Sequence, residues 1–318
     1  MTQATAGTTK RVWIDTDCGF DDFAAIAMVH ASAAWEIAGI GLVAGNAPLD
    51  IVVANAQRIH AFLGLSAPLH PGRARPVLGP PLSAQSILGE DAMKSAGESL
   101  PRPAKNVPLG QDAIPALIAA LTVSREPLTI LALGPLTNIA ITVLAAPECA
   151  AKIAEVIWMG GSASAGNYTA AAEFNALVDP EAAAIVLRSD VALKMVGLDA
   201  CRQVPVTLAD VARLRNCGPS RAAITADLLE GYVRIASADG SRPMALYDPT
   251  AAAALIMPET VAFVPASIAI ECGAGITRGM TVCEFRPHKA PPNAAVARAA
   301  DSGAIVDACL AALAGDRL

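Results

Sequence analysis

The sequence predicts an α/β protein with a mostly parallel, Rossmann-like open sheet and helices on both faces. Short β-branched runs alternate along the chain with longer Ala- and Leu-rich stretches of helical period, as expected of repeated β-α units. Of the 318 residues, 54% are hydrophobic and only 16% are charged, so the chain can bury a large core on both sides of a sheet.

The clearest alternation lies in the first 200 residues. Strands are predicted where short aliphatic runs end at polar or glycine residues, at 12–14, 37–44, 128–133, 156–159 and 193–197. Helices are predicted where apolar residues recur with helical period, at 23–33, 50–63, 111–122, 136–144 and 180–187. Pro180 begins the last of these helices, where proline is favoured.

The rest of the chain is less regular. Residues 67–108 are rich in Pro, Gly and Ser and predict a long loop, of a kind that is usually functional or mobile. Further on, we predict helix over 207–237, loop over 237–248, strands over 261–270 and 281–285, and a closing helix over 305–313. There is no internal repeat and no composition typical of a linker. We therefore predict a flexible tail over residues 1–10 and a single domain over 11–318.

Composition excludes several classes of protein. A formal net charge of −6 argues against binding to nucleic acid or to an anionic membrane, since both need clustered positive charge. No apolar stretch is long enough to span a bilayer, and the start of the chain lacks the apolar core of a signal peptide. The seven cysteines form no C-x-x-C pair, so we expect free thiols in a cytoplasmic protein. A Cys272–Cys283 disulfide is the alternative.

The sharpest local feature is a cluster of four carboxylates in residues 15–22, where the first strand gives way to a helix. In an open α/β sheet, ligands bind beyond the carboxyl ends of the strands, where this segment is expected. Capping the helix needs one carboxylate, at Asp21 or Asp22, whereas four crowded carboxylates repel one another unless a cation neutralises them. All-oxygen donors favour Ca²⁺ or Mg²⁺. We therefore favour a metal site over a solvated cap.

Six short motifs occur in an order typical of one family: Asp15–Asp22 (D-T-D-x-G-x-D-D), Val43–Asn46, Ala132–Asn138, Met159–Gly161, Glu173–Asn175 and Asp179–Glu181. Through them, from residue 11 to beyond 248, the chain resembles the inosine–uridine nucleoside hydrolases, which are Ca²⁺-dependent N-ribohydrolases. The resemblance implies that family's fold and the hydrolysis of ribonucleosides to ribose and free base in nucleoside salvage. It also implies Ca²⁺ as cofactor, a ribonucleoside as the small-molecule partner, and a homotetramer or homodimer.

The resemblance also implies roles for individual residues. The expected Ca²⁺ ligands are Asp17, Asp22, Asp248 and the backbone carbonyl of Leu133. The expected ribose contacts are Asp21, Asn175 and Asp248 at the 2′- and 3′-hydroxyls, Asn167 and Glu173 at the 5′-hydroxyl, and Asn46 and Met159 along the pocket. Asp17 is expected to be the general base that takes a proton from a calcium-bound water, and Asp21 to share in catalysis. Carboxylates suit this reaction because the sugar becomes oxocarbenium-like as the glycosidic bond breaks.

Taken singly, several of these residues have simpler explanations. Asn46 is compatible with an ordinary turn, and Met159 with the hydrophobic core. Glu173 and Asn175 flank a buried aromatic residue and could be its polar neighbours. Asp248, followed by proline, fits a helix N-cap. A functional role is favoured because all of these residues occupy positions that match the family's motifs.

The sequence departs from the family on the side of the leaving base. Tyr247 stands where relatives commonly carry histidine, and Leu88-Gly89 where many have His-Gly. We predict that the four histidines of the chain are structural or surface residues. Tyr247 is the candidate catalytic residue here, although a phenol is a weaker acid than an imidazolium; Tyr168 and Tyr232 are further candidates for contact with the base.

This departure predicts a retained ribose site and an altered base preference. An N-ribohydrolase for a non-standard leaving group is one alternative function. A non-catalytic, metal-dependent protein that binds a nucleoside or ribose is another. The segments 67–108 and 236–248 are candidates for lids over the substrate.

Overall fold

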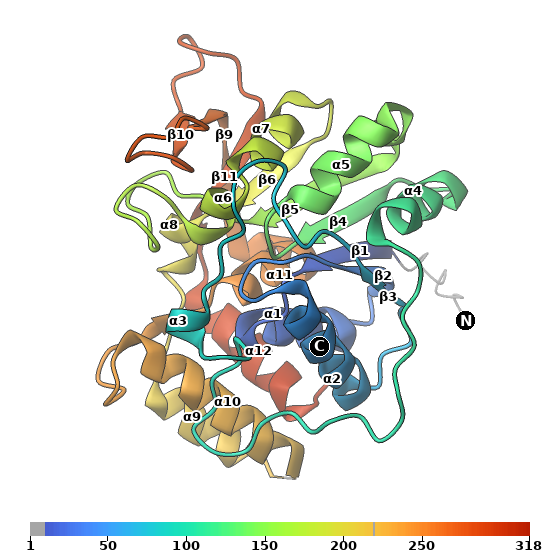
Figure 1. The fold of residues 1–318 in the computed structure, drawn as a ribbon. Coiled ribbons are helices and arrows are strands. Elements are labelled where there is room, and N and C mark those ends of the chain that lie inside the picture. The colour runs from blue at the N-terminus through green and yellow to red at the C-terminus, as the bar shows by residue number, and fades with distance from the viewer. Residues whose placement is uncertain (1–9, 219) are drawn as a thin grey trace, which may run out of the picture.

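The computed structural model describes residues 10–218 and 220–318, and its core is a nine-stranded sheet (Figure 1). The strands of the sheet are β1 (Lys10–Thr16), β2 (Trp35–Leu42), β3 (Leu69–Pro71), β4 (Leu128–Ala132), β5 (Ile153–Met159), β6 (Leu193–Val196), β9 (Val261–Ile270), β10 (Thr281–Glu284) and β11 (Ala294–Ala300). A separate antiparallel pair joins β7 (Pro205–Val206) to β8 (Met244–Ala245). Of the expected tail, residues 1–9 lie outside the described residues, and Lys10 begins β1.

The sheet has the order β10-β9-β11-β6-β5-β4-β1-β2-β3. From β11 to β3 every neighbouring pair is parallel, and β9 and β10 add an antiparallel edge, so the predicted mostly parallel open sheet is confirmed. The chain first runs outward from β1 to β2 and β3 and then returns to β4 on the other side of β1. This reversal between β1 and β4 is a topological switch point, where open α/β sheets bind their ligands.

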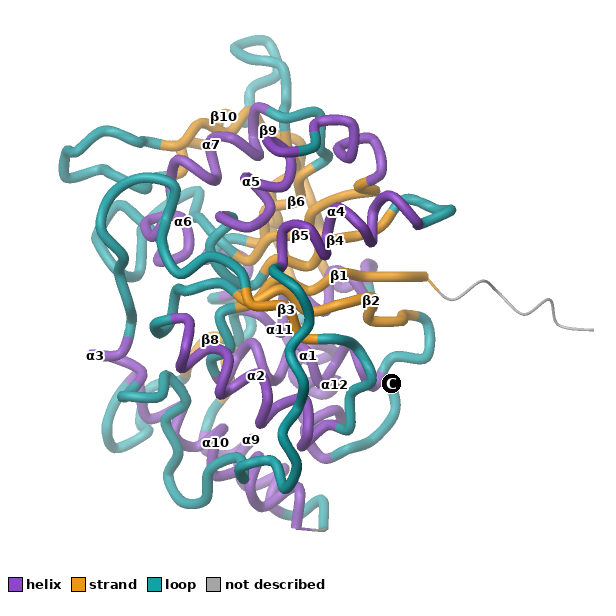
Figure 2. Tube along the Cα trace, turned by 45° about the vertical axis from the view of Figure 1, so that its right-hand side comes forward, coloured by secondary structure: helices purple, strands orange, loops and turns teal. Residues whose placement is uncertain are grey.

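Helices cover both faces of the sheet, as Figures 1 and 2 show. One face carries α1 (Phe20–Ala31), α2 (Leu49–Leu63), α11 (Asp248–Ile256) and α12 (Ser302–Ala314), with α9 (Leu208–Arg215) and α10 (Ser220–Ala236) packed outside them. The other face carries α4 (Ala113–Val123), α5 (Thr137–Ala145) and α7 (Pro180–Arg188). Shorter elements complete the fold: α3 (Gln85–Leu88), α6 (Phe174–Val178), α8 (Leu198–Cys201) and the 3₁₀ turns η1 (Pro147–Lys152) and η2 (Pro258–Thr260).

Strand β1 shows why the strands read as continuous apolar runs. Val12 and Ile14 belong to the core beneath α1 and α11, whereas Trp13 points into the core on the opposite face. All three side chains are buried. A strand that is covered on both sides needs apolar residues at every position, and the alternation typical of a half-exposed strand is absent.

The segment 67–108 is more ordered than its composition suggests. It contains β3 and α3, and it buries Met93, Leu100 and Val107 in the core on the α1 face. Two of its backbone amides bind the same residue of α10: Ala96 N donates to the Asp227 carbonyl (2.9 Å), and Glu98 N donates to Asp227 Oδ2 (2.8 Å). The segment is therefore fastened to α10 over part of its length.

Several element boundaries differ from those the sequence predicts. The first helix begins at Phe20, three residues early, because the Asp22 carboxylate accepts the Gly19 N–H (2.8 Å) and so caps the helix from within its first turn. The predicted helix over 207–237 is wrong as one unit, since α9 ends at Arg215 and Gly218 has a φ of +108°. Strand β11 has no counterpart among the predicted elements, and helix α11 was indicated only by its start, where Asp248 is followed by proline.

Two further expectations can be compared with the structure. All seven cysteines, including Cys272 and Cys283, are free thiols. In the part of the chain that the structure describes, no helix has both the length and the apolar character needed to cross a bilayer.

Candidate active site

The loop after β1 carries the acidic motif and turns sharply. Cys18 has a φ of +51°, a left-handed conformation that is uncommon for a residue with a side chain and that tends to mark functional sites. The turn is held by Asp22, whose carboxylate accepts hydrogen bonds from the Gly19 N–H and from the Thr16 hydroxyl. Asp21 and Asp22 thereby occupy the first turn of α1, at the switch point of the sheet.

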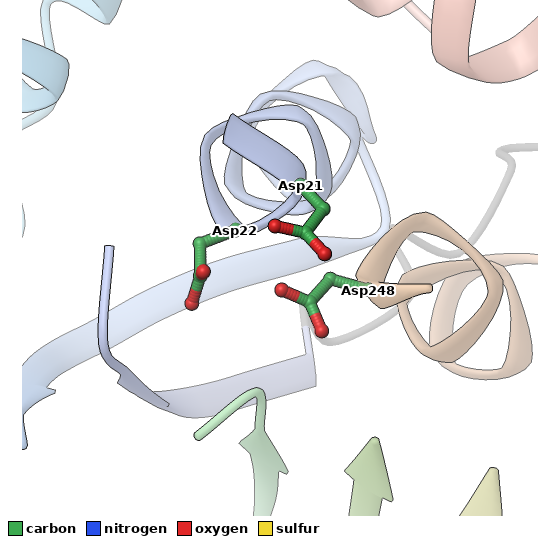
Figure 3. A group of neighbouring side chains, drawn as sticks. All are labelled: Asp21, Asp22 and Asp248. Carbon is green, nitrogen blue, oxygen red and sulfur yellow. The ribbon is translucent and has the colours of Figure 1, made fainter. Parts of the chain in front are cut away.

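Three carboxylates converge at this point. One oxygen each from Asp21, Asp22 and Asp248 lies within 4.8 Å of the others, and Figure 3 shows the three groups facing one another. Asp248 comes from far along the chain, as the first residue of α11, which packs against α1. The sequence places Asp248 as a possible N-cap, but the helix begins at Asp248 itself and Tyr247 precedes it. Asp22 and Asp248 are fully or almost fully buried.

Asp17 lies beside these three carboxylates and is held by Asn46. The Asn46 backbone N–H donates to Asp17 Oδ2 (2.7 Å), and its side-chain amide donates to Asp17 Oδ1 (3.1 Å) and approaches Asp22 Oδ2 (3.3 Å). Asn46 is therefore more than a turn residue. A Cβ on Gly45 would collide with the Asp17 carboxylate, and one on Gly134 would lie 3.2 Å from its carboxyl carbon. Asp17 is thus wedged between the loops that follow β2 and β4.

Burial perturbs all four acids, and none of them is paired with a Lys or Arg side chain among the described residues. Loss of solvent raises the pKa of Asp21 to about 7, raises that of Asp22, and raises those of Asp17 and Asp248 well above the usual value. The negative charge of Asp22 raises the pKa of the other three further. A divalent cation among these groups would reverse the effect, because its charge favours the ionised carboxylates.

Glu173 and Asn175 lie at the start of α6 and organise the neighbouring wall. Glu173 caps this helix: its carboxylate accepts the N–H groups of Asn175 (2.8 Å), Ala176 (2.9 Å) and Gly161 (2.8 Å). Burial raises the pKa of Glu173 to about 7, and the N–H donors act against that rise. The Asn175 amide donates to the carbonyls of Leu133 (2.9 Å) and Met159 (3.0 Å), which ties together the ends of β4 and β5.

A cavity of about 340 Å³ opens at these residues, which is large enough for a small polar molecule. Nearly all of the residues predicted for the site line it: Asp21, Asn46, Leu133, Met159, Asn167, Glu173, Asn175, Tyr247 and Asp248, with Tyr168 and Tyr232. The exceptions are Asp17 and Asp22, which lie buried behind the lining. None of the four histidines is among the lining residues.

The sequence prediction missed other residues of the lining. These are Ala84, Ile87, Phe174, Ile235, Ala236, Arg242 and Met244. Most of them are apolar or exposed and belong to no motif. The only sequence signal for a role of Arg242 and Met244 in the site is that they lie in the loop that leads to Asp248. Leu88, identified through its position in place of a family histidine, also lines the cavity.

Three tyrosines line the cavity, and two of them, Tyr232 and Tyr247, lie in perturbed surroundings. The Tyr232 hydroxyl donates to the Ala245 carbonyl (2.7 Å) and lies 3.4 Å from Asp21 Oδ2. Burial is the main cause that raises the pKa of Tyr247 to about 12. Neither phenol is therefore a strong acid at neutral pH.

A mostly parallel sheet with an acidic, all-oxygen group at its switch point, beside a cavity of small-molecule size, is typical of enzymes that bind a metal and a small polar substrate. Comparison with known proteins gives the family. A sequence model of the inosine-uridine preferring nucleoside hydrolases matches residues 12–307. The chain belongs to this metal-dependent family, and it is a hydrolase that cleaves the N-glycosidic bond of ribonucleosides.

Individual relatives agree with this assignment. The pyrimidine-specific ribonucleoside hydrolase RihA of Salmonella gallinarum is 34% identical over 300 residues, which are 92% of this chain and 95% of that protein. RihA of Enterobacter sp. is 34% identical over 275 residues, covering 86% and 87% of the two chains. Among solved structures, the purine-preferring ribonucleoside hydrolase from Gardnerella vaginalis has a TM-score of 0.86 at 25% identity, covering 96% and 98% of the two chains. The plant nucleoside hydrolase PpNRh1 has a TM-score of 0.88 at 26% identity, covering 96% and 99%.

Proposed function

We propose that this hydrolase uses Ca²⁺, held by Asp17, Asp22, Asp248 and the backbone carbonyl of Leu133. The observation that carries the proposal is the convergence of carboxylates: oxygens of Asp21, Asp22 and Asp248 lie within 4.8 Å of one another. Asp17 lies outside that group but close enough for the charges of Asp22 and Asp21 to raise its pKa. Every donor in the set is an oxygen, as Ca²⁺ prefers, and carboxylates together with a backbone carbonyl are its usual ligands. The Leu133 carbonyl accepts one hydrogen bond, from Asn175, and so retains a lone pair.

When bound, Ca²⁺ supplies positive charge that keeps the surrounding carboxylates ionised and lowers the pKa of water nearby. Asp17 is the proposed general base. Its two oxygens are fixed by the Asn46 N–H and amide, so the carboxylate cannot rotate freely. In this position Asp17 accepts the proton of the water that attacks the anomeric carbon of ribose.

The residues around the cavity would bind the sugar. Asp21, Asn175 and Asp248 are proposed to hold the 2′- and 3′-hydroxyls. Asn167 and Glu173 are proposed to hold the 5′-hydroxyl, with Asn46 and Met159 against the ring. As the glycosidic bond breaks, ribose becomes positively charged, and the carboxylates of Asp21 and Asp248 would stabilise that charge. Asp21 thus contributes to catalysis as well as to binding.

Tyr247 is proposed to contact the leaving base, by stacking or by a hydrogen bond from its hydroxyl. Tyr168 and Tyr232 line the same cavity, together with apolar residues of the segments 84–88 and 235–244. Because the family's usual histidines are replaced by Tyr247 and Leu88, we propose that the base preference differs from the family's usual one. Relatives that prefer purines and relatives specific for pyrimidines both resemble this chain.

A substrate panel tests the proposal. The purified protein is incubated with inosine, guanosine, adenosine, uridine and cytidine, and released ribose and free base are quantified. We expect ribose and base in equal amounts, abolition by chelator with recovery on adding Ca²⁺, and a loss of at least about 10³-fold in kcat for Asp17→Asn. The exposed Asp190, changed to Asn in a control variant, should leave activity intact.

Two results would redirect the proposal. Nucleoside binding without release of ribose would favour a non-catalytic binding protein. Release of ribose only from ribosides with other leaving groups would favour an N-ribohydrolase for a non-standard substrate. We also propose that the protein forms a single domain over residues 11–318, acts in the cytoplasm and assembles as a homotetramer or homodimer. Light scattering of the purified protein measures its state of assembly.

A further inference from the structure

The wall of the cavity carries a marked imbalance of charge. Three acids line it, Asp21, Glu173 and Asp248, but Arg242 is the single positively charged side chain among the lining residues. The acids belong to the proposed ribose site, where positive charge develops as the bond breaks. Negative charge develops at the same time on the departing base, and an ionised carboxylate cannot stabilise it.

Proton donors for the base are scarce in this cavity. The Tyr232 hydroxyl already donates to the Ala245 carbonyl (2.7 Å), and no histidine lines the cavity. Tyr247 and Tyr168 are phenols, which are weak acids near neutral pH. A base that leaves without receiving a proton leaves as an anion, and an anion needs a cation nearby.

Arg242 is positioned by a compact turn at the end of α10. Its backbone N–H donates to Ser237 Oγ (3.0 Å), and Gly240 N donates to the Ser237 carbonyl (2.8 Å). The Arg234 guanidinium, which also binds Glu230, donates a hydrogen bond to the Ala238 carbonyl in the same turn (2.9 Å). Within residues 10–218 and 220–318, the Arg242 guanidinium forms no ion pair, so its charge is available to a ligand.

We infer that Arg242 is a catalytic residue that stabilises the leaving base as an anion. The inference rests on the proposed function. The electron pair of the glycosidic bond stays on the base nitrogen, the hydroxide part of water bonds to the anomeric carbon, and the water's proton goes to Asp17. The base anion then takes a proton from solvent, and Asp17 gives its proton to solvent, which regenerates the carboxylate. The guanidinium donates hydrogen bonds to an oxygen of the base as its negative charge grows, and it stays charged throughout because a guanidinium is not deprotonated in proteins.

This role selects a class of substrate. Bases that carry a carbonyl oxygen conjugated with the departing nitrogen, namely 6-oxopurines and 2-oxopyrimidines, can place negative charge on an atom that the guanidinium binds. Adenine has no carbonyl oxygen. Loss of the Arg242 guanidinium should therefore slow the cleavage of inosine, guanosine, uridine and cytidine more than that of adenosine.

The test compares natural nucleosides with 4-nitrophenyl β-D-ribofuranoside, whose leaving group is a stable anion without help from the enzyme. Arg242→Met should lower kcat/KM for inosine and uridine by about 10²-fold or more, the usual loss when one charge-stabilising donor is removed. For the nitrophenyl riboside the same variant should lose less than about threefold, and Arg242→Lys should recover part of the activity on nucleosides. Arg286→Met, which removes an exposed cation paired with Glu284 and absent from the cavity lining, is the control for net charge.

The possible failures are distinct. Equal losses on both kinds of substrate would make Arg242 a binding or structural residue, and no loss on nucleosides would remove it from the reaction; either result overturns the inference. Neither touches the proposed function, which fails only if the wild-type enzyme releases no ribose from any nucleoside. Thermal unfolding of Arg242→Met, expected to match that of the wild type, shows that any loss of activity is not a loss of fold.

Discussion

Removing the proposed Ca²⁺ from the acidic site should destabilise the protein in a way that depends strongly on pH. Two carboxylates 4.8 Å apart repel each other by about 3 kcal/mol at the effective dielectric constant of about 20 that suits such sites. Asp21, Asp22 and Asp248 form three such pairs. Full ionisation of this group without a counter-charge would therefore cost on the order of 10 kcal/mol, which is comparable to the stability of a whole domain.

The direction of the pH effect follows from the raised pKa values. Burial raises the pKa of Asp21 to about 7, and raises those of Asp22, Asp17 and Asp248. In the unfolded chain these groups ionise near pH 4, so the folded, metal-free protein binds protons more tightly than the unfolded one. The contribution of these groups to the stability of the metal-free protein is thus greatest below pH 4. That contribution is lost as pH rises through about 7.

Thermal unfolding of chelated protein at pH 5 and pH 8, with and without CaCl₂, measures this effect. Calcium at about 100 times its dissociation constant stabilises the folded state by about 2.7 kcal/mol. For a chain of this size, which gains about 2.1 cal/mol/K of entropy per residue on unfolding, that corresponds to a rise in Tm of about 4 °C, which we expect at pH 8. At pH 5 protons already neutralise part of the site, so the rise should be less than half as large.

Matched variants make the assay specific. Asp248→Asn should abolish the calcium-induced rise in Tm, whereas Asp190→Asn, at an exposed position, should retain it. An equal rise at both pH values, or a full rise in Asp248→Asn, would refute the reasoning, since the stabilisation would then come from somewhere other than this group of carboxylates.

Three further changes have outcomes that the structure predicts. Gly45→Ala should lower kcat by at least about tenfold, because the new methyl group displaces the Asp17 carboxylate, while Gly275→Ala, in open space, should be neutral; steady-state kinetics of both decide. Tyr247→Phe should cost less than about tenfold in kcat/KM, and a loss of 10²-fold or more would show that this weak acid does protonate the base. Asp179→Ala should destabilise the fold by about 2–4 kcal/mol in urea unfolding, because the buried carboxylate accepts hydrogen bonds from Val77 N, Thr137 Oγ1 and Ala182 N; a change below 1 kcal/mol would contradict this.

The sheet could be predicted from the sequence because its central strands are buried on both faces. Val12, Trp13 and Ile14 read as a strand without any knowledge of their neighbours. Strand β11, by contrast, has the sequence AAVARAA, and alanine favours helices. Its extended conformation comes from pairing with β6 and β9, which are distant in sequence. Local sequence patterns could therefore not predict the strand β11.

The candidate site likewise contains some residues that local sequence predicts and others that depend on long-range packing. Asp17, Asp21 and Asp22 form a dense local motif, so their place at the end of β1 could be predicted directly. The contribution of Asp248 depends on the packing of α11 against α1, and only the resemblance to a family indicated it. The only sequence signal for Arg242 was its place in the candidate lid 236–248, because a lone arginine in an exposed loop cannot be told from any other surface charge until the cavity is known.

The direct test of the acidic site is to titrate Ca²⁺ back into metal-stripped enzyme while bound calcium and ribose release from a cleaved nucleoside are both measured. Ribose release should be absent at the start and should rise in proportion to bound calcium until one ion is held per chain. Release of ribose at the full rate before any calcium binds, or calcium bound without effect on the rate, would contradict a catalytic metal at Asp17, Asp22 and Asp248.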